Sequence, residues 1–194
     1  MTTLVITAFI IFYVITVFNR LVTLKNRLKN AFAQIDVQLK RRYDLIPNLV
    51  EVAKGYIKHE RETLEAVIEA RNVAMSCLKN LAADPGKIEA VKSLVGAESN
   101  LANALSKLNV VMESYPELKA NQNMQQLHGE IASTENRISF SRQTFNDAVM
   151  EFNTYRQSFP QNFLSGIFGF REDATMLEFS DKAAIQETPK VSFT

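Results

Sequence analysis

The first 18 residues of the chain form one uninterrupted apolar stretch, MTTLVITAFIIFYVITVF, without a charged side chain. As a helix that rises 1.5 Å per residue, this stretch spans about 27 Å, close to the thickness of the hydrocarbon core of a bilayer. A buried core helix and a cleaved signal peptide are the alternatives. The stretch lacks the basic start and the small residues before a cleavage site that signal peptides share. Residues 1–18 are therefore predicted to form a single, uncleaved transmembrane helix.

Basic residues predict how this helix is oriented. Arg20, Lys25, Arg27 and Lys29 follow the apolar stretch directly, and the first acidic residue, Asp36, comes later. Positive charges that flank a span favour the cytoplasmic side. We therefore expect the N-terminus to lie outside and the rest of the chain to lie in the cytoplasm.

Beyond the apolar stretch, hydrophobic residues recur at steps of three and four, the period of a helix that packs on other helices. Four such runs cover Leu21 to Ile35, Ile46 to Leu81, Val91 to Met112 and Met124 to Tyr155. Prolines and a glycine interrupt the later runs at Asp84–Gly86, Tyr115–Pro116 and Pro160. The pattern predicts an all-α fold, in which residues 19–159 form an antiparallel, up-and-down, coiled-coil-like bundle of four helices.

Pro47 is the ambiguous point of this pattern. A proline that follows an aspartate cap, here Asp44, starts a new helix, whereas the same proline within a helix only kinks it. We expect a reversal of the chain at Pro47, because it lets both flanking runs share one core. The alternative is a kinked continuous helix, which gives three long helices and a long stalk.

Residues 160–194 are predicted to lie outside the bundle. They begin with a strongly apolar segment and continue from Arg171 as a mixed sequence that we expect to be loosely ordered. The apolar segment either caps the bundle or forms a patch that docks on the membrane or on another subunit. The residues of this candidate interaction patch are Phe163, Leu164, Ile167, Phe168 and Phe170.

Composition gives no sign of enzymatic chemistry. Lys+Arg 22 against Asp+Glu 21 provides no positive field for nucleic acid. The single cysteine, Cys77, is interpreted as a small hydrophobic residue and not as a nucleophile. A di-metal site in a helical bundle needs a glutamate three residues before a histidine, but Gln125 takes that position before His128. Glycine-rich phosphate loops are missing from the sequence. We expect no catalytic, cofactor-binding or metal-binding residues.

Charged residues nevertheless fall on or beside the hydrophobic seams. Buried charges are costly unless they are paired, so these positions predict ion pairs between helices, with Glu98 bound to Arg71 or Arg137. A catalytic carboxylate is the alternative. We expect the basic cluster Lys40, Arg41, Arg42 to be a solvated helix end. The candidate ion-pair network comprises Arg71, Glu98, Glu135, Arg137 and Arg142.

Several short strings resemble the LemA family. They run in order from about residue 19 to residue 193, and their number makes the resemblance specific. The strings are RRYDLIPNLVEVAKGYIKHE (41–60), YPELKAN (115–121), TENRI (134–138), FNDAV (145–149), Phe152-Asn153, Phe159-Pro160 and Phe168-Gly169-Phe170.

The resemblance implies a bacterial inner-membrane protein with a cytoplasmic helical bundle, no established enzymatic activity and no cofactor. Two functions remain open. The first is a membrane-tethered scaffold that contacts the lipid bilayer and assembles with itself or with an unidentified protein. The second is a hydrolase or regulatory subunit that uses carboxylates of the seams.

Overall fold

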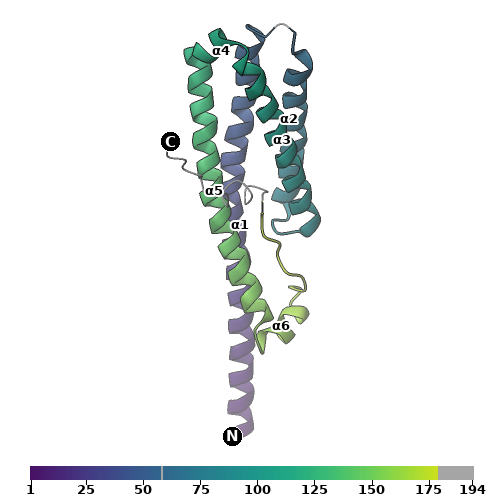
Figure 1. The fold of residues 1–194 in the computed structure, drawn as a ribbon. Helices are drawn as coiled ribbons and strands as arrows, with labels where there is room; N and C mark the ends of the chain where they lie inside the picture. Colours follow the sequence, from purple (N-terminus) through teal and green to yellow (C-terminus); the bar gives the residue numbers. More distant parts are fainter. Residues whose placement is uncertain (58, 179–194) are drawn as a thin grey trace, which may run out of the picture.

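The computed structural model describes residues 1–57 and 59–178, and all regular secondary structure in these residues is helical. Four long helices and two short ones follow one another along the chain, which confirms the predicted all-α class (Figure 1). They are α1 (Thr2–Lys54), α2 (Arg61–Ala83), α3 (Ile88–Glu113), α4 (Pro116–Ala120), α5 (Gln122–Gln157) and α6 (Gln161–Ile167).

Helix α1 is a single element of 53 residues that contains both the apolar stretch and the first bundle helix. Pro47 lies inside it. The predicted reversal at Pro47 is therefore wrong, as is the predicted single helix from Ile46 to Leu81. The chain turns instead between Gly55 and Glu60, so the bundle still has four long helices. The first part of α1 projects from the bundle (Figure 1).

The exposed part of α1 is long and apolar enough to span a membrane, with a mean hydropathy of 2.1 over its most apolar window of 18 residues. Only 11% of that window is buried inside the molecule, whereas a core helix of similar hydropathy would be mostly covered. Thr7 and Thr16 donate their hydroxyl groups to carbonyl oxygens one turn earlier, at 2.9 Å, which lowers the cost of placing them in lipid.

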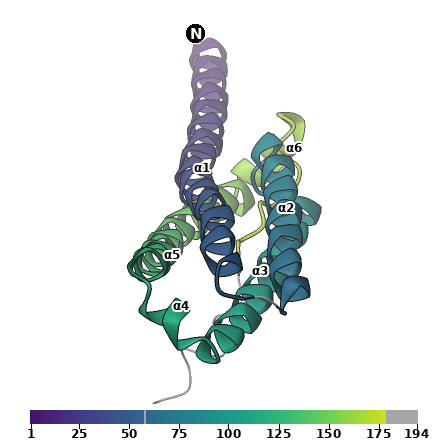
Figure 2. The ribbon, with the colours of Figure 1, turned by 90° about the horizontal axis from the view of Figure 1, so that it is seen from above.

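In the bundle, α5 runs antiparallel beside α1, and α2 and α3 form a hairpin on another side of α1 (Figures 1 and 2). Leucine, isoleucine and aromatic side chains from all four helices fill one core, and Tyr43, Phe145 and Leu94 are among its fully buried members. Short α4 bridges α3 and α5 at the end remote from the N-terminus (Figure 1). Asn121, at the end of the YPELKAN string, caps α5 by accepting the Met124 N–H at 3.1 Å.

Beyond α6 and the turn that follows it, residues 171–178 form an extended strap that returns along the bundle (Figure 1). Gly86, in the α2–α3 turn, accepts the Thr175 N–H at 2.9 Å. Its φ of +103° and the 3.0 Å that would separate an added Cβ from the Cβ of Ala174 both favour glycine there. Leu177 is fully buried in the main core. Residues 171–178 are thus bound to the bundle, contrary to the predicted loose tail, and residues 179–194 lie outside the described part.

Candidate functional site

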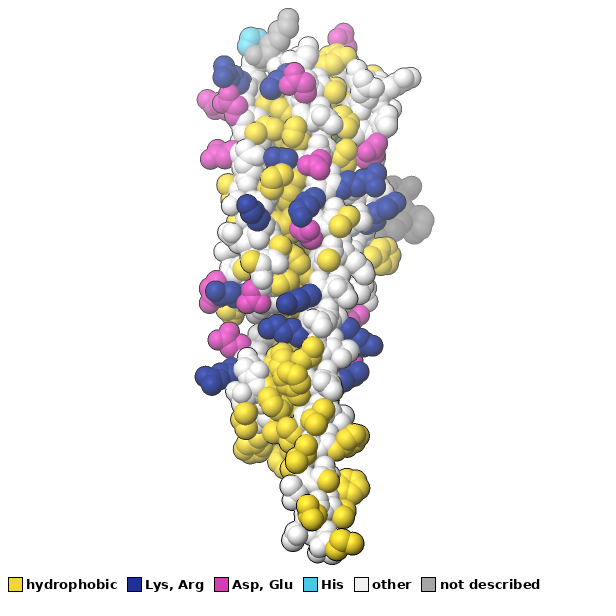
Figure 3. Space-filling view, turned by 180° about the vertical axis from the view of Figure 1, so that it is seen from behind, with side chains coloured by type: hydrophobic (Ala, Val, Ile, Leu, Met, Phe, Trp, Pro, Cys, Tyr) yellow, Lys and Arg dark blue, Asp and Glu magenta, His cyan; other side chains and the backbone are white. Residues whose placement is uncertain are grey.

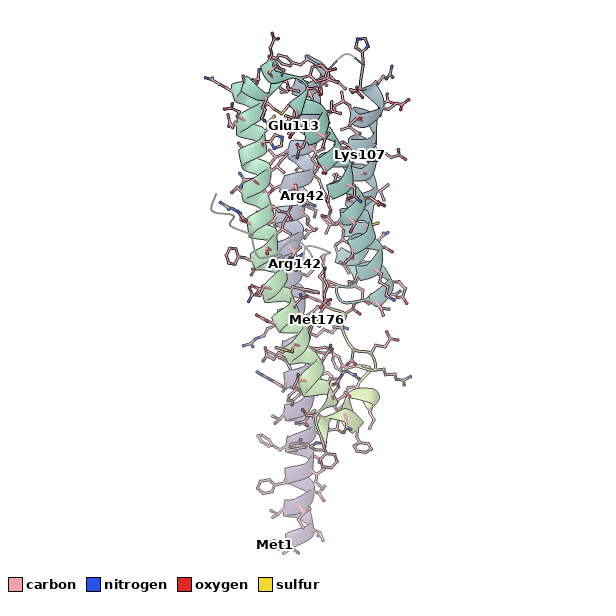
Figure 4. All side chains as sticks on the ribbon, viewed as in Figure 1. Met1, Arg42, Lys107, Glu113, Arg142 and Met176 are labelled. Atoms are coloured by element: carbon pink, nitrogen blue, oxygen red, sulfur yellow. The ribbon has the colours of Figure 1, made fainter. Side chains whose placement is uncertain are left out.

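The middle of the bundle contains a buried polar cluster. Arg42 on α1 donates to the carboxylates of Glu98 on α3 and Glu135 on α5, and the Tyr43 hydroxyl donates to the other oxygen of Glu98. The side chain of Arg42 is 8% exposed and that of Glu98 6%, whereas that of Glu135 is 50% exposed. The predicted solvated helix end is therefore wrong for Arg42, which is a core residue (Figure 4).

Arg71 joins the same region from α2, but it does not bind Glu98. Its Nε donates to the backbone carbonyl of Tyr43 at 2.9 Å, and its Nη2 lies 3.6 Å from the carboxylate of the exposed Asp44. The cluster therefore joins all four long helices, α3 and α5 through ion pairs with Arg42, and α2 mainly through the hydrogen bond of Arg71 to the backbone of α1. Such pairs fix which helix faces which, because a shifted register would leave a buried charge without a partner.

The other two residues of the predicted network lie elsewhere on α5. Arg137 is exposed, and Arg142 is half-buried, nearer to the N-terminal end of the molecule than Arg42 (Figure 4). Of the predicted set, the structure thus places Arg71, Glu98 and Glu135 around Arg42, the residue that the sequence analysis assigned to solvent.

The cluster has the features of a structural clamp. The Glu98 side chain is 6% exposed, and each of its carboxylate oxygens already accepts a hydrogen bond, one from Arg42 and one from Tyr43, so a substrate has little access to it. Burial raises the pKa of the Tyr43 hydroxyl well above its usual range, which keeps it a neutral donor. Among the described residues, no group of three or more His, Cys, Asp or Glu side chains is arranged to hold a metal ion.

A groove of about 770 Å³ opens between the end of α1 and the first half of α2. Its floor is apolar and includes Val50, Ile57 and Leu64, all nearly fully buried. Its rim carries charges of both signs: Lys54, Arg61, Glu65 and Glu69. The groove lies at the end of the bundle remote from the apolar part of α1, and we call it the distal groove.

At the opposite end, α6 and the residues beside it form a foot, residues 159–170, against α1 and α5 (Figure 1). Leu164, Phe168 and Phe170 of the predicted patch face the bundle and pack on a cluster that includes Val17 and Phe152. Phe163 and Ile167 face outward and are 68% and 77% exposed. The predicted patch is therefore divided into an inner face, which caps the bundle, and an outer face.

Two asparagines that the sequence analysis did not single out hold the strap. Asn153 accepts the Ala174 N–H at 2.9 Å and donates to the Ala174 carbonyl at 2.8 Å, and Asn146 does the same with Leu177 at 2.8 and 3.1 Å. These residues lie seven positions apart, so both point from one face of α5. They occur in FNDAV and in Phe152-Asn153, two of the strings that carry the resemblance noted above.

Comparison with known proteins agrees with those strings. The model of the LemA family matches residues 31–193. The chain is similar to magnetosome protein MamQ 2 of Paramagnetospirillum magneticum, with 24% identity over 90% of this chain and 68% of that protein. It is also similar to magnetosome protein MamQ of Magnetospirillum gryphiswaldense, with 22% identity over the same shares. Protein LemA of Metamycoplasma hominis is 27% identical over 79% of this chain and 70% of that protein.

Proposed function

This chain belongs to the LemA family, and we propose that it is a membrane-anchored scaffold that holds a rigid helical bundle in the cytoplasm and assembles with further copies of itself. The family and its relatives support a membrane-associated helical protein of LemA type. The scaffold role, the inner membrane, the cytoplasmic orientation and the self-assembly are the proposal.

The continuity of α1 is the observation that carries the proposal. One helix leaves the apolar stretch and runs without interruption to the distal groove. From residue 19 to Lys54 it covers about 54 Å at 1.5 Å per residue, so the groove would stand at a set height above the membrane. The Arg42 cluster clamps the other three long helices to this rod. An enzyme needs a reactive group that a substrate can reach. The buried charges of the Arg42 cluster instead bind to one another and hold the helices together.

Self-assembly is proposed through the distal groove. Its apolar floor suits the hydrophobic face of a helix. Its rim has two basic and two acidic residues and thus no net charge, so a second copy can approach with the same surface without repulsion, as a two-fold interface requires. Anchoring would confine the copies to one plane and raise their effective concentration. Helix α3 adds little apolar surface for such an interface, because its Leu94, Leu101 and Leu108 are all buried in its own bundle.

Cysteine crosslinking in native membranes tests this proposal. In a Cys77→Ser background, Val73→Cys places a thiol at the groove, and Phe140→Cys places one at a more exposed position on α5. We expect a short bifunctional thiol reagent to trap dimers of the Val73→Cys variant and to leave the Phe140→Cys variant monomeric. Monomers from both variants, together with a monomeric mass of the parent in lipid nanodiscs, would refute self-assembly.

The orientation has its own test. Basic residues after the span favour a cytoplasmic bundle. The full chain, fused after Thr194 to alkaline phosphatase, should therefore give no phosphatase activity in a Gram-negative host. The same chain fused to a fluorescent protein that matures only in the cytoplasm should fluoresce. Active phosphatase would place the bundle on the other side of the membrane.

A further inference from the structure

We propose that the foot is a second membrane contact, in which Phe159, Phe163 and Ile167 insert into the lipid–water interface beside the transmembrane part of α1. This inference deepens the proposed function and rests on its membrane anchor. The three side chains are 78%, 68% and 77% exposed, although the rest of the patch is packed inward. Phe159 and Phe163 also contact each other edge to face, with ring centroids 6.2 Å apart, so they form one apolar surface.

The position of the foot along α1 indicates that its outer face contacts lipid. Phe168 contacts the ring of Phe18, the last residue of the uncharged apolar stretch, edge to face at a centroid distance of 5.1 Å. Val17, one residue earlier, is almost completely covered, and it clusters with Leu164. The foot therefore lies at the level at which the predicted span ends. If α1 crosses a bilayer, the outer face of the foot meets the zone where lipid tails give way to head groups.

The charged residues of the foot and of α1 are distributed as in segments that lie at a membrane interface. Residues 157–170 contain no charged side chain, just as residues 1–19 contain none, and an arginine follows each uncharged stretch, Arg171 and Arg20. Lys25 lies over the ring of Phe170, with its Nζ 5.7 Å from the centroid. Basic and aromatic side chains at one level are typical of segments that lie in the interface of a membrane with anionic lipids.

The surface of the molecule is likewise divided into a charged part and an uncharged, apolar part. In the view of Figure 3, dark blue and magenta side chains end above the lower part of the molecule, and yellow side chains continue from there onto the projecting end of α1. The apolar surface of the foot is thus continuous with that of the span. A second copy bound to the foot would have to compete with lipid for this position, because the anchor holds the foot at the membrane.

Lipid-borne quenchers test the inference in the full-length chain. Single cysteines are introduced into the Cys77→Ser background at Phe163 and Ile167, at Phe9 in the span and at Val110 on α3, all of which are exposed. Each variant is labelled with an environment-sensitive fluorophore and reconstituted into phosphatidylcholine–phosphatidylglycerol vesicles. The lipids of one set of vesicles carry a doxyl group near the end of the acyl chain, which reaches the label at Phe9 in the middle of the span, and those of the other set carry it near the head group. We expect the lipids with the doxyl group near the head group to quench the labels at 163 and 167 at least twofold more than the label at 110.

The label at Phe9 separates the two ways in which the inference can fail. If that label is quenched and those at 163 and 167 behave like that at 110, the anchor stands and the foot does not contact lipid. If the label at Phe9 is also unquenched, the anchor is wrong and the inference falls with it. Thiol crosslinks between two Ile167→Cys chains, with no quenching at 167, would assign the outer face to a second copy and overturn the proposal.

Discussion

Arg71 on α2 donates its Nε–H to the backbone carbonyl oxygen of Tyr43 on α1 at 2.9 Å. This carbonyl is the one that the residue four positions later in a helix normally satisfies, and that residue is Pro47, which has no N–H. Tyr43 is completely buried, so its carbonyl cannot turn to water instead. A side chain from the neighbouring helix thus replaces the hydrogen bond that the proline removes, and α1 continues through Pro47.

Replacing Arg71 by alanine should therefore depend on Pro47. In the parent, Arg71→Ala leaves a buried carbonyl without a partner, which costs about 1–3 kcal/mol. In a Pro47→Ala background, the amide of residue 47 can bind that carbonyl, so the same substitution should cost about 1 kcal/mol less. Denaturant unfolding of the four variants of this cycle in mild detergent, followed by circular dichroism, measures the difference. Equal costs in both backgrounds would show that the carbonyl is not what Arg71 stabilises.

Pro47 also explains which parts of the fold the sequence could reveal. The ends of α2, α3 and α5 lie at local breakers, Pro85 and Gly86, Pro116, and Pro160, and local rules suffice to find them. Whether a proline ends a helix or remains inside it depends on a partner far along the chain. The structural partner here, Arg71, is 28 residues from Tyr43 in sequence.

The error at Pro47 caused the error at Arg42. A helix that ended near Asp44 would place Arg42 in its solvated last turn. In the continuous helix, the rhythm of buried residues, Ile35, Leu39, Arg42, Ile46 and Leu49, brings its side chain into the core. Sequence thus indicated most of the acidic members of the cluster, Glu98 and Glu135, but not their basic partner. The asparagine contacts of the strap have no comparable local pattern, because side-chain bonds to a distant backbone segment do not alter the period of α5.

The Arg42 cluster predicts unequal effects for its two glutamates. Glu98→Ala leaves Arg42 buried with one carboxylate and the Tyr43 hydroxyl without its acceptor, so we expect a loss of about 3–5 kcal/mol of unfolding free energy. Glu135→Ala removes a half-exposed partner and should cost about 1 kcal/mol or less. Thermal and denaturant unfolding of the detergent-solubilised chain compares them.

Replacing the buried pair as a whole provides the control for this comparison. In the double variant Arg42→Met/Glu98→Leu, no buried charge is left unpaired at these two positions, and apolar side chains of similar volume are often tolerated in place of such pairs. We expect the double variant to be more stable than Glu98→Ala alone. If it is less stable than Glu98→Ala, the unpaired charge of Arg42 is not what destabilises that single variant.

Stability at high pH should depend on Tyr43. Burial raises the pKa of its hydroxyl in the folded state, whereas an unfolded tyrosine titrates near 10. The folded state therefore holds its proton more tightly, so this contribution is complete below about pH 10 and declines as the pH rises above it. The parent should lose about 1 kcal/mol relative to Tyr43→Phe between pH 10 and pH 11, because the unfolded tyrosine is already half ionised at pH 10. Parallel pH profiles of the unfolding free energy of the two chains would contradict the effect of burial.

The strap gives the last prediction, which concerns local rather than global stability. Asn153 binds both backbone groups of Ala174, and Asn153→Ala removes both bonds, which are worth about 1–3 kcal/mol together. The population of chains with an open strap should then rise roughly 5- to 150-fold, with little change for the core helices. Amide hydrogen exchange of overlapping peptides that together cover residues 172–178, compared with peptides from α2, measures this directly.

Two further variants make the strap experiment specific. Asn153→Asp keeps the oxygen that accepts the Ala174 N–H but lacks the donor for the Ala174 carbonyl, so exchange should lie between that of the parent and that of Asn153→Ala. Asn103→Ala changes an exposed asparagine on α3 and should leave strap exchange unchanged. Because Leu177 remains buried and Asn146 still binds it, the opening should be confined to the part of the strap near Ala174. Exchange that is uniformly faster from residue 172 to residue 178 would mean that the two asparagines act as one unit.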